Sequence, residues 1–120
     1  MTVPVLKLGE YLIASVQEAL TDSDLMKLRE ELLDMVGRHR SRGVVIDVSA
    51  LDIMDSFSCR TLRDLSHSLK LRGAEAIVVG IKPEVAFSMV QLGLSLEQVM
   101  TGVDLEDGIA CLDERTKGNL

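Results

Sequence analysis

Two carboxylates and two hydroxyls lie within seven residues of one another, at Asp52, Asp55, Ser56 and Ser58. Neighbouring carboxylates can bind a divalent cation or act as acid and base. A serine hydroxyl can act as a nucleophile or accept a phosphoryl group. Serine hydrolysis, however, needs a histidine base and an oxyanion hole, and no base can be recognised as the partner of Ser56.

A strand followed directly by a helix positions this cluster. Val44–Val48 is a mostly apolar run rich in β-branched residues after a glycine, which is typical of a buried strand. The helical pattern starts at Asp55, so Asp55 and Ser56 fall at a helix start, where free N–H groups favour negative charge. Either residue could simply cap the helix, because Asp and Ser are among the preferred N-caps.

The chain ahead of this strand predicts a hairpin and a helix. Apolar runs at 3–8 and 11–16 flank a glycine turn, and Pro4 places the first run at a sheet edge because proline cannot donate to a ladder. Thr21 and Asp24 have capping-box spacing, and the apolar stripe that follows predicts an amphipathic helix packed on the sheet.

A second buried strand, Ala76–Val79, follows the helix that begins at the cluster. Strand, helix and strand form a right-handed βαβ unit, in which sites lie beyond the carboxyl ends of the strands. That is where 52–56 falls. Three elements are predicted after it: a short helix entered at Pro83, an edge strand at 98–100 and a last helix over 105–112.

Composition limits the size and class of the protein. With 120 residues, we expect one domain over 1–120, of which 116–120 is a frayed tail. Aromatic residues make up only 2%, so the core must be aliphatic. A net charge of −6 argues against nucleic-acid binding, since phosphate contacts dominate that affinity. No apolar run is long enough for a membrane span, and the N-terminus lacks a basic region ahead of an apolar one, so we expect a cytoplasmic protein.

Signatures of cofactor and metal sites are missing from the sequence. Neither GxGxxG nor GxxxxGK[ST] follows a strand, so the usual nucleotide cradles are not expected. His39 and His67 are far apart, and Asp52 and Asp55 alone are a weak magnesium site. We therefore expect no metal and no cofactor.

The segment that ends in Asp55-Ser56 resembles the signature of the STAS family, the anti-sigma-factor-antagonist domains. The resemblance covers nearly the whole order of elements, including Gly80–Val85 and the pair Leu92-Gly93. It implies a single STAS-like α/β domain, with a mixed, mostly parallel β-sheet and about four α-helices.

In this family, the hydroxyl residue after the aspartate is the target of a partner serine/threonine kinase. The resemblance therefore implies that Ser56 is the phosphoacceptor, with Ser58 as the second candidate. Four residues around it are expected to contact the partner: Asp52, Asp55, Phe57 and Arg60. Many single-domain antagonists have glycines after this serine. The glycine-free continuation found here is more similar to the small scaffold subunits of stressosomes.

This likeness implies a non-catalytic scaffold that sequesters a switch kinase and releases it when Ser56 is phosphorylated. Self-association, as a dimer within a large assembly, and binding to sensor co-antagonists with a C-terminal STAS domain are implied as well. Two alternatives stay open. A free antagonist that captures an anti-sigma-factor kinase would stay small when mixed with sensor proteins. A small α/β enzyme that uses Asp52, Asp55 and Ser56 would carry a bound metal or nucleotide.

Overall fold

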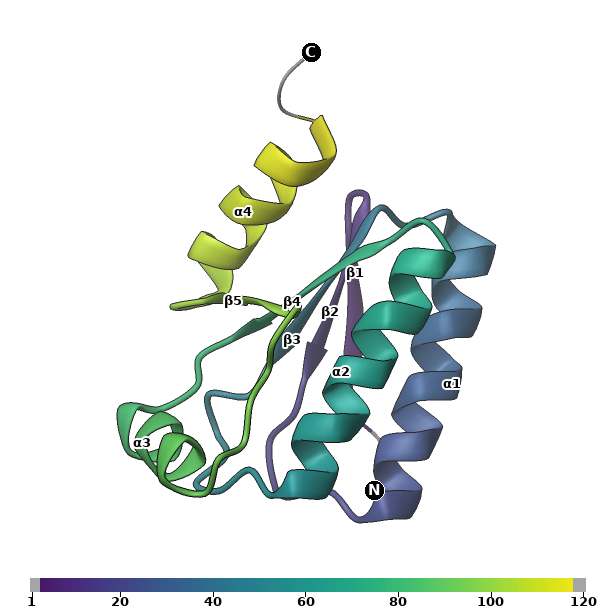
Figure 1. The fold of residues 1–120 in the computed structure, drawn as a ribbon. Helices are drawn as coiled ribbons and strands as arrows, with labels where there is room; N and C mark the ends of the chain where they lie inside the picture. The colour runs from purple at the N-terminus through teal and green to yellow at the C-terminus, as the bar shows by residue number, and fades with distance from the viewer. Residues whose placement is uncertain (1–2, 118–120) are drawn as a thin grey trace.

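The computed structural model describes residues 3–117, which form a five-stranded sheet with helices on both faces (Figure 1). The strands are β1 (Val5–Leu8), β2 (Tyr11–Ser15), β3 (Gly43–Asp47), β4 (Glu75–Val79) and β5 (Met100–Gly102). The helices are α1 (Asp22–His39), α2 (Ser56–Leu71), α3 (Pro83–Gln91) and α4 (Leu105–Lys117).

The five strands lie side by side in the order in which they follow one another along the chain. β1 is antiparallel to β2 and every other neighbouring pair is parallel, so the predicted mixed, mostly parallel sheet is confirmed. Asp47 at the end of β3 pairs with Val79 at the end of β4. The carboxyl ends of the central strands therefore meet at one edge of the sheet, where the loop before α2 begins.

Alternate residues of the central strands face two separate cores. Val44 and Ile46 pack with residues of α1 and α2, while Val45 packs with Leu112 of α4 on the opposite face, and all four side chains are fully buried. Figure 1 shows α1 and α2 together on one face and α4 across the sheet. Since both faces are covered, the strands are apolar throughout rather than alternating.

Helix α1 begins with the capping box that the spacing predicts. The backbone N–H of Asp24 donates to the Thr21 hydroxyl at 3.1 Å, and the backbone N–H of Thr21 donates to the Asp24 carboxylate at 3.2 Å. Leu28, Leu32 and Val36 are buried against the sheet. The amphipathic helix is confirmed, and its apolar stripe packs within this chain.

Helix α4 is longer than the prediction of 105–112, because it continues to Lys117. The Tyr11 hydroxyl at the start of β2 hydrogen-bonds the carboxylate of Asp113 and lies 3.1 Å from the Thr116 hydroxyl. Burial, followed by the bond to Asp113, raises the pKa of Tyr11. Long-range contacts thus hold the last turn of α4 in place, and local sequence patterns carry no sign of them.

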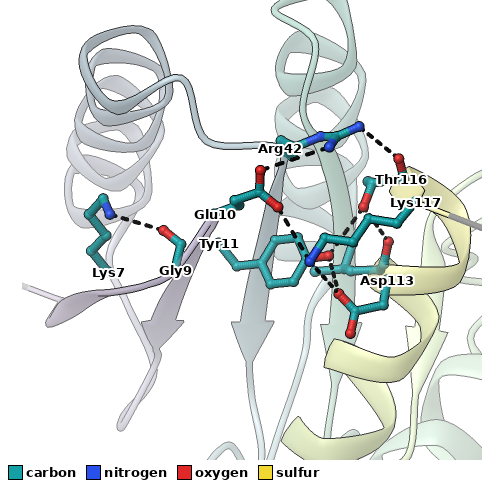
Figure 2. A network of polar contacts seen from close by, with 9 residues as sticks. Lys7, Gly9, Glu10, Tyr11, Arg42, Asp113, Thr116 and Lys117 are labelled. Carbon is teal, nitrogen blue, oxygen red and sulfur yellow. Dashed lines mark hydrogen bonds and ion pairs between the residues drawn. The ribbon is translucent and has the colours of Figure 1, made fainter.

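Charged side chains at the β1–β2 turn, before β3 and at the end of α4 complete this attachment (Figure 2). The Lys117 ammonium lies 3.3 Å from the Glu10 carboxylate, and the Arg42 guanidinium donates to the Thr116 carbonyl at 2.7 Å. Thr116 and Lys117, which were predicted to belong to a frayed tail, instead form the end of α4. The rest of that predicted tail, 118–120, lies outside the described residues.

The last strand is displaced from its predicted position. We expected an edge strand at 98–100, whereas β5 spans Met100–Gly102 at the edge beside β4. Gln98 has a φ of +69°, which is left-handed and unsuited to a strand. Of the four helices described, none is long and apolar enough to cross a membrane.

Candidate functional site

The cluster of carboxylates and hydroxyls lies on an anchored loop between β3 and α2. Leu51 and Met54 point into the core, whereas Asp52, Asp55 and Ser56 are exposed. The buried pair fixes the path of the loop, and the polar residues between and after it face solvent. Ser56 is the first residue of α2, so its hydroxyl stands at the helix start, at the end of the loop that leaves β3.

Asp55, rather than Ser56, caps α2. Its backbone is extended, and its carboxylate accepts the Ser58 N–H at 2.8 Å. Hydrogen bonds from Ser58, first from the backbone and then from the side chain, lower the pKa of Asp55. Of the two candidates, Asp55 is therefore the cap. Within residues 3–117, the Ser56 hydroxyl makes no hydrogen bond.

Ser58 is less accessible than Ser56. Its side chain is half-buried, faces Asp55 and lines a small apolar pocket together with Leu62. A modifying enzyme must reach the hydroxyl oxygen, so the geometry favours Ser56 of the two predicted serines.

Asp52 contacts a residue that no sequence pattern singles out. Its carboxylate lies 2.6 Å from the ammonium of Lys82, which immediately precedes α3. The hydrogen bond and the charge of Lys82 lower the pKa of Asp52, and the same bond raises the pKa of Lys82. A lysine after the neighbouring parallel strand could have been the signal, because both strands end at the same edge. This ion pair ties the serine loop to α3.

Phe57 and Arg60 follow Ser56 on α2 and line a groove between α1 and α2. Phe57 is half-buried and Arg60 is exposed. Of the predicted partner-contacting residues, Asp55, Phe57 and Arg60 therefore lie close to the serine along one helix start. Asp52 is directed toward α3 instead.

The described part of the chain holds no group of three histidine, cysteine, aspartate or glutamate side chains that could bind a metal ion. Asp52 pairs with Lys82, and Asp55 is used as a cap. The site therefore presents an exposed serine directly after two carboxylates that are already engaged. An arrangement of this kind can accept a group from another protein.

Removing the cap gives the first testable result. We expect Asp55→Ala to lower the free energy of unfolding at neutral pH by about 1 kcal/mol, because the Ser58 N–H loses its acceptor. The pKa of Asp55 is lowered by folding, so its stabilisation is present above the unfolded value and is lost as pH falls through the folded value. The difference between wild type and variant should therefore shrink below about pH 4.

Urea titrations at neutral and acid pH measure this difference. Asp64→Ala is the matched control, because Asp64 is exposed on the same helix and makes no hydrogen bond or ion pair with any residue described. A stability difference for Asp55→Ala that stays constant between the two pH values would contradict the assigned cap.

Comparisons with known proteins agree with this architecture. The model of the STAS domain matches residues 3–106. RsbT co-antagonist protein RsbRA of Bacillus subtilis (strain 168) is 31% identical over 117 residues, which is 97% of this chain. The chain spans 43% of the length of that relative.

Two solved structures resemble the chain over nearly its whole length. A serine-to-glutamate variant of RsbS from Moorella thermoacetica is 34% identical, with a TM-score of 0.79 over 94% of this chain and 96% of that one. A chain of the stressosome, described as a signal integration and transduction hub, is also 34% identical, with a TM-score of 0.78 over 95% and 99% of the two chains. On its family model and these relatives, the chain belongs to the STAS domain family and is of the type found in stressosomes.

Proposed function

We propose that this protein is a non-catalytic scaffold of a stressosome-like assembly in the cytoplasm. It binds a switch serine/threonine kinase similar to RsbT and releases that kinase once Ser56 is phosphorylated. Sensor co-antagonists similar to RsbR are its other partners, and it self-associates as a dimer within the assembly.

One observation carries this proposal: the 34% identity to RsbS extends over 94% of this chain and 96% of that structure. RsbRA, by contrast, is matched over less than half of its length. The name of RsbRA supports a kinase partner of the RsbT kind, and the stressosome structure supports a large assembly. The solved RsbS variant exchanges a serine for a negatively charged residue, which fits a protein that is switched by charge on serine.

The chemistry at Ser56 is phosphoryl acceptance. The hydroxyl oxygen attacks the γ-phosphoryl group of ATP held by the kinase, the hydroxyl proton passes to a base of the kinase, and ADP leaves. The product carries about 1.5 to 2 negative charges at a helix start. The helix dipole favours that charge by about 0.3–1 kcal/mol, while Asp52 and Asp55 oppose it, so the fold should change little.

The larger consequence falls on the partner surface. A charge that becomes desolvated without a partner, or that meets a like charge across an interface, costs several kcal/mol. Phosphorylation therefore releases the bound kinase without unfolding the scaffold. Ser56 acts as a binding switch and takes no part in turnover within this chain.

The proposal is tested by phosphate uptake. With the cognate kinase and ATP, we expect wild type and Ser58→Ala to take up about one phosphate each, and Ser56→Ala to take up none, because Ser56 carries the accessible hydroxyl. Mass spectrometry of the intact chain and of its peptides reads the result. Undiminished uptake by Ser56→Ala would remove Ser56 as the acceptor.

A size measurement tests the assembly separately. Mixed with a sensor co-antagonist, the scaffold should elute in a particle far larger than either protein alone. If the mixture elutes as monomers or dimers, the scaffold role is wrong and a free antagonist that uses the same serine takes its place.

A further inference from the structure

A groove of about 450 Å³ runs between α1 and α2 beside the serine site. The two helices lie next to each other on one face of the sheet (Figure 1). Side chains from both helices line the groove, among them Met26, Arg29, Phe57, Arg60, Asp64 and His67. Because Phe57 and Arg60 are in the first turns of α2, one end of the groove lies at Ser56.

The two arginines of this groove have no acidic partner. Six other cations form ion pairs: Arg38, Arg42, Lys70, Lys82, Arg115 and Lys117. Among the described residues, neither Arg29 nor Arg60 makes such a pair, even with Asp64 in the same groove. The chain has 19 acidic and 13 basic residues, yet no described carboxylate lies within ion-pair distance of either of these two guanidinium groups. Two arginines and one aspartate line the groove, so the lining carries a net positive charge.

The lining also offers apolar surface next to these charges. Met26 is 44% exposed, and the half-buried Phe57 forms part of the wall. Guanidinium groups bind carboxylates through paired hydrogen bonds, and an adaptable methionine suits an apolar side chain of varied shape. A complementary segment is therefore acidic and carries at least one apolar side chain.

The position of Arg60 connects this groove with the phosphoacceptor. Arg60 follows Ser56 by four residues, the spacing at which two side chains become neighbours on a helix surface. Helical side chains lean toward the N-terminus, so the Arg60 guanidinium covers the turn that contains Ser56. A phosphate on Ser56 would lie within reach of that cation and would compete with any carboxylate that occupies the groove.

We propose that the α1–α2 groove docks an acidic, apolar-bearing segment of the kinase, and that phosphorylated Ser56 closes the groove by pairing with Arg60. This inference rests on the proposed function and adds the chemistry of the kinase contact and the way in which it is broken. Release then follows from competition for one cation inside the scaffold, in addition to repulsion between the two proteins.

Charge reversal in the full-length chain tests the docking step. We expect Arg29→Glu and Arg60→Glu each to raise the dissociation constant for the kinase at least tenfold, measured by calorimetry without ATP. The matched controls Lys27→Glu and Arg72→Glu reverse an exposed cation of α1 and an exposed cation at the C-cap of α2, both outside the groove, and should leave the constant within twofold. Circular dichroism checks that every variant is folded.

The two possible failures of this experiment are distinguishable. If wild type binds the kinase and the groove variants bind equally well, docking in the groove is refuted and the proposed function stands. If wild type itself does not bind the kinase, the proposed function is refuted and the groove loses its occupant.

The closing step has its own readout, independent of kinase binding. In the phosphorylated chain, a ³¹P titration reports the second ionisation of the Ser56 phosphate. Pairing with Arg60 favours the dianion, so the pKa of the phosphate should be higher in Arg60→Ala than in wild type, with Arg72→Ala unchanged. Equal pKa values in wild type and Arg60→Ala would refute the pairing.

Discussion

Replacing Ser56 with glutamate is expected to weaken kinase binding about a hundredfold. The new carboxylate stands at an exposed helix start that the kinase must cover, beside the carboxylate of Asp55. Desolvating this charge next to the like charge of Asp55 costs several kcal/mol, and a loss of about 2.7 kcal/mol corresponds to a hundredfold in the dissociation constant. Calorimetry measures this loss directly, by comparing how the kinase binds the Ser56→Glu variant and the unphosphorylated wild type.

The matched control for this substitution is Ser23→Glu. Ser23 is also exposed in the first turn of a helix, so the added charge meets a similar helix dipole. Ser23→Glu should bind the kinase like wild type, and both variants should unfold within about 0.5 kcal/mol of wild type because surface charges of this kind contribute little. Equal weakening by the two variants would show that net charge, and not the charge at Ser56, controls release.

The site was predictable from the sequence where its geometry is local. An apolar strand, a short loop and a helix start follow one another within fifteen residues, so the exposed position of Ser56 needs no distant contact. The choice between Asp55 and Ser56 as the cap was not predictable, because both residue types suit the position. The structure decides it, because the backbone of Asp55 is extended and its carboxylate accepts the Ser58 N–H.

Contacts between distant segments were the part that the sequence did not reveal. Asp52 and Lys82 are 30 residues apart, and the register of β3 with β4 places them together. Tyr11 reads as an ordinary strand residue, yet its hydroxyl holds Asp113 and so keeps the end of α4 helical. The sequence pattern places Arg29 on the solvated side of α1. Only the packing of α1 on α2 brings it into the same groove as Arg60.

The second large effect is expected at Gly80, where β4 ends next to the serine loop. Its φ is +82°, a backbone conformation that residues with a Cβ rarely adopt. A Cβ at this position would lie 2.8 Å from the Ser49 Cβ and 3.1 Å from the Ser49 Cα. Ser49 belongs to the loop that leads to α2, so the glycine permits a close approach between two strand ends.

Gly80→Ala should therefore lower the free energy of unfolding by about 2–4 kcal/mol. The left-handed backbone accounts for about 1–2 kcal/mol, and the displacement of the Ser49 backbone accounts for the remainder. Gly73→Ala separates these causes, because Gly73 has a φ of +88° with nothing within 4 Å of the added methyl group. In urea titrations, Gly73→Ala should lower the free energy of unfolding by about the backbone contribution alone.

The additional loss of unfolding free energy in Gly80→Ala, relative to Gly73→Ala, measures how rigidly the end of β4 supports the serine loop. If both alanine variants lose the same stability, the contact with Ser49 relaxes freely and the loop is not held there. If Gly80→Ala loses more and also slows phosphate uptake at Ser56 at a temperature where the chain stays folded, the packing of Ser49 positions the acceptor. Buried Leu51 and Met54 lie between the two serines and would carry that displacement along the loop.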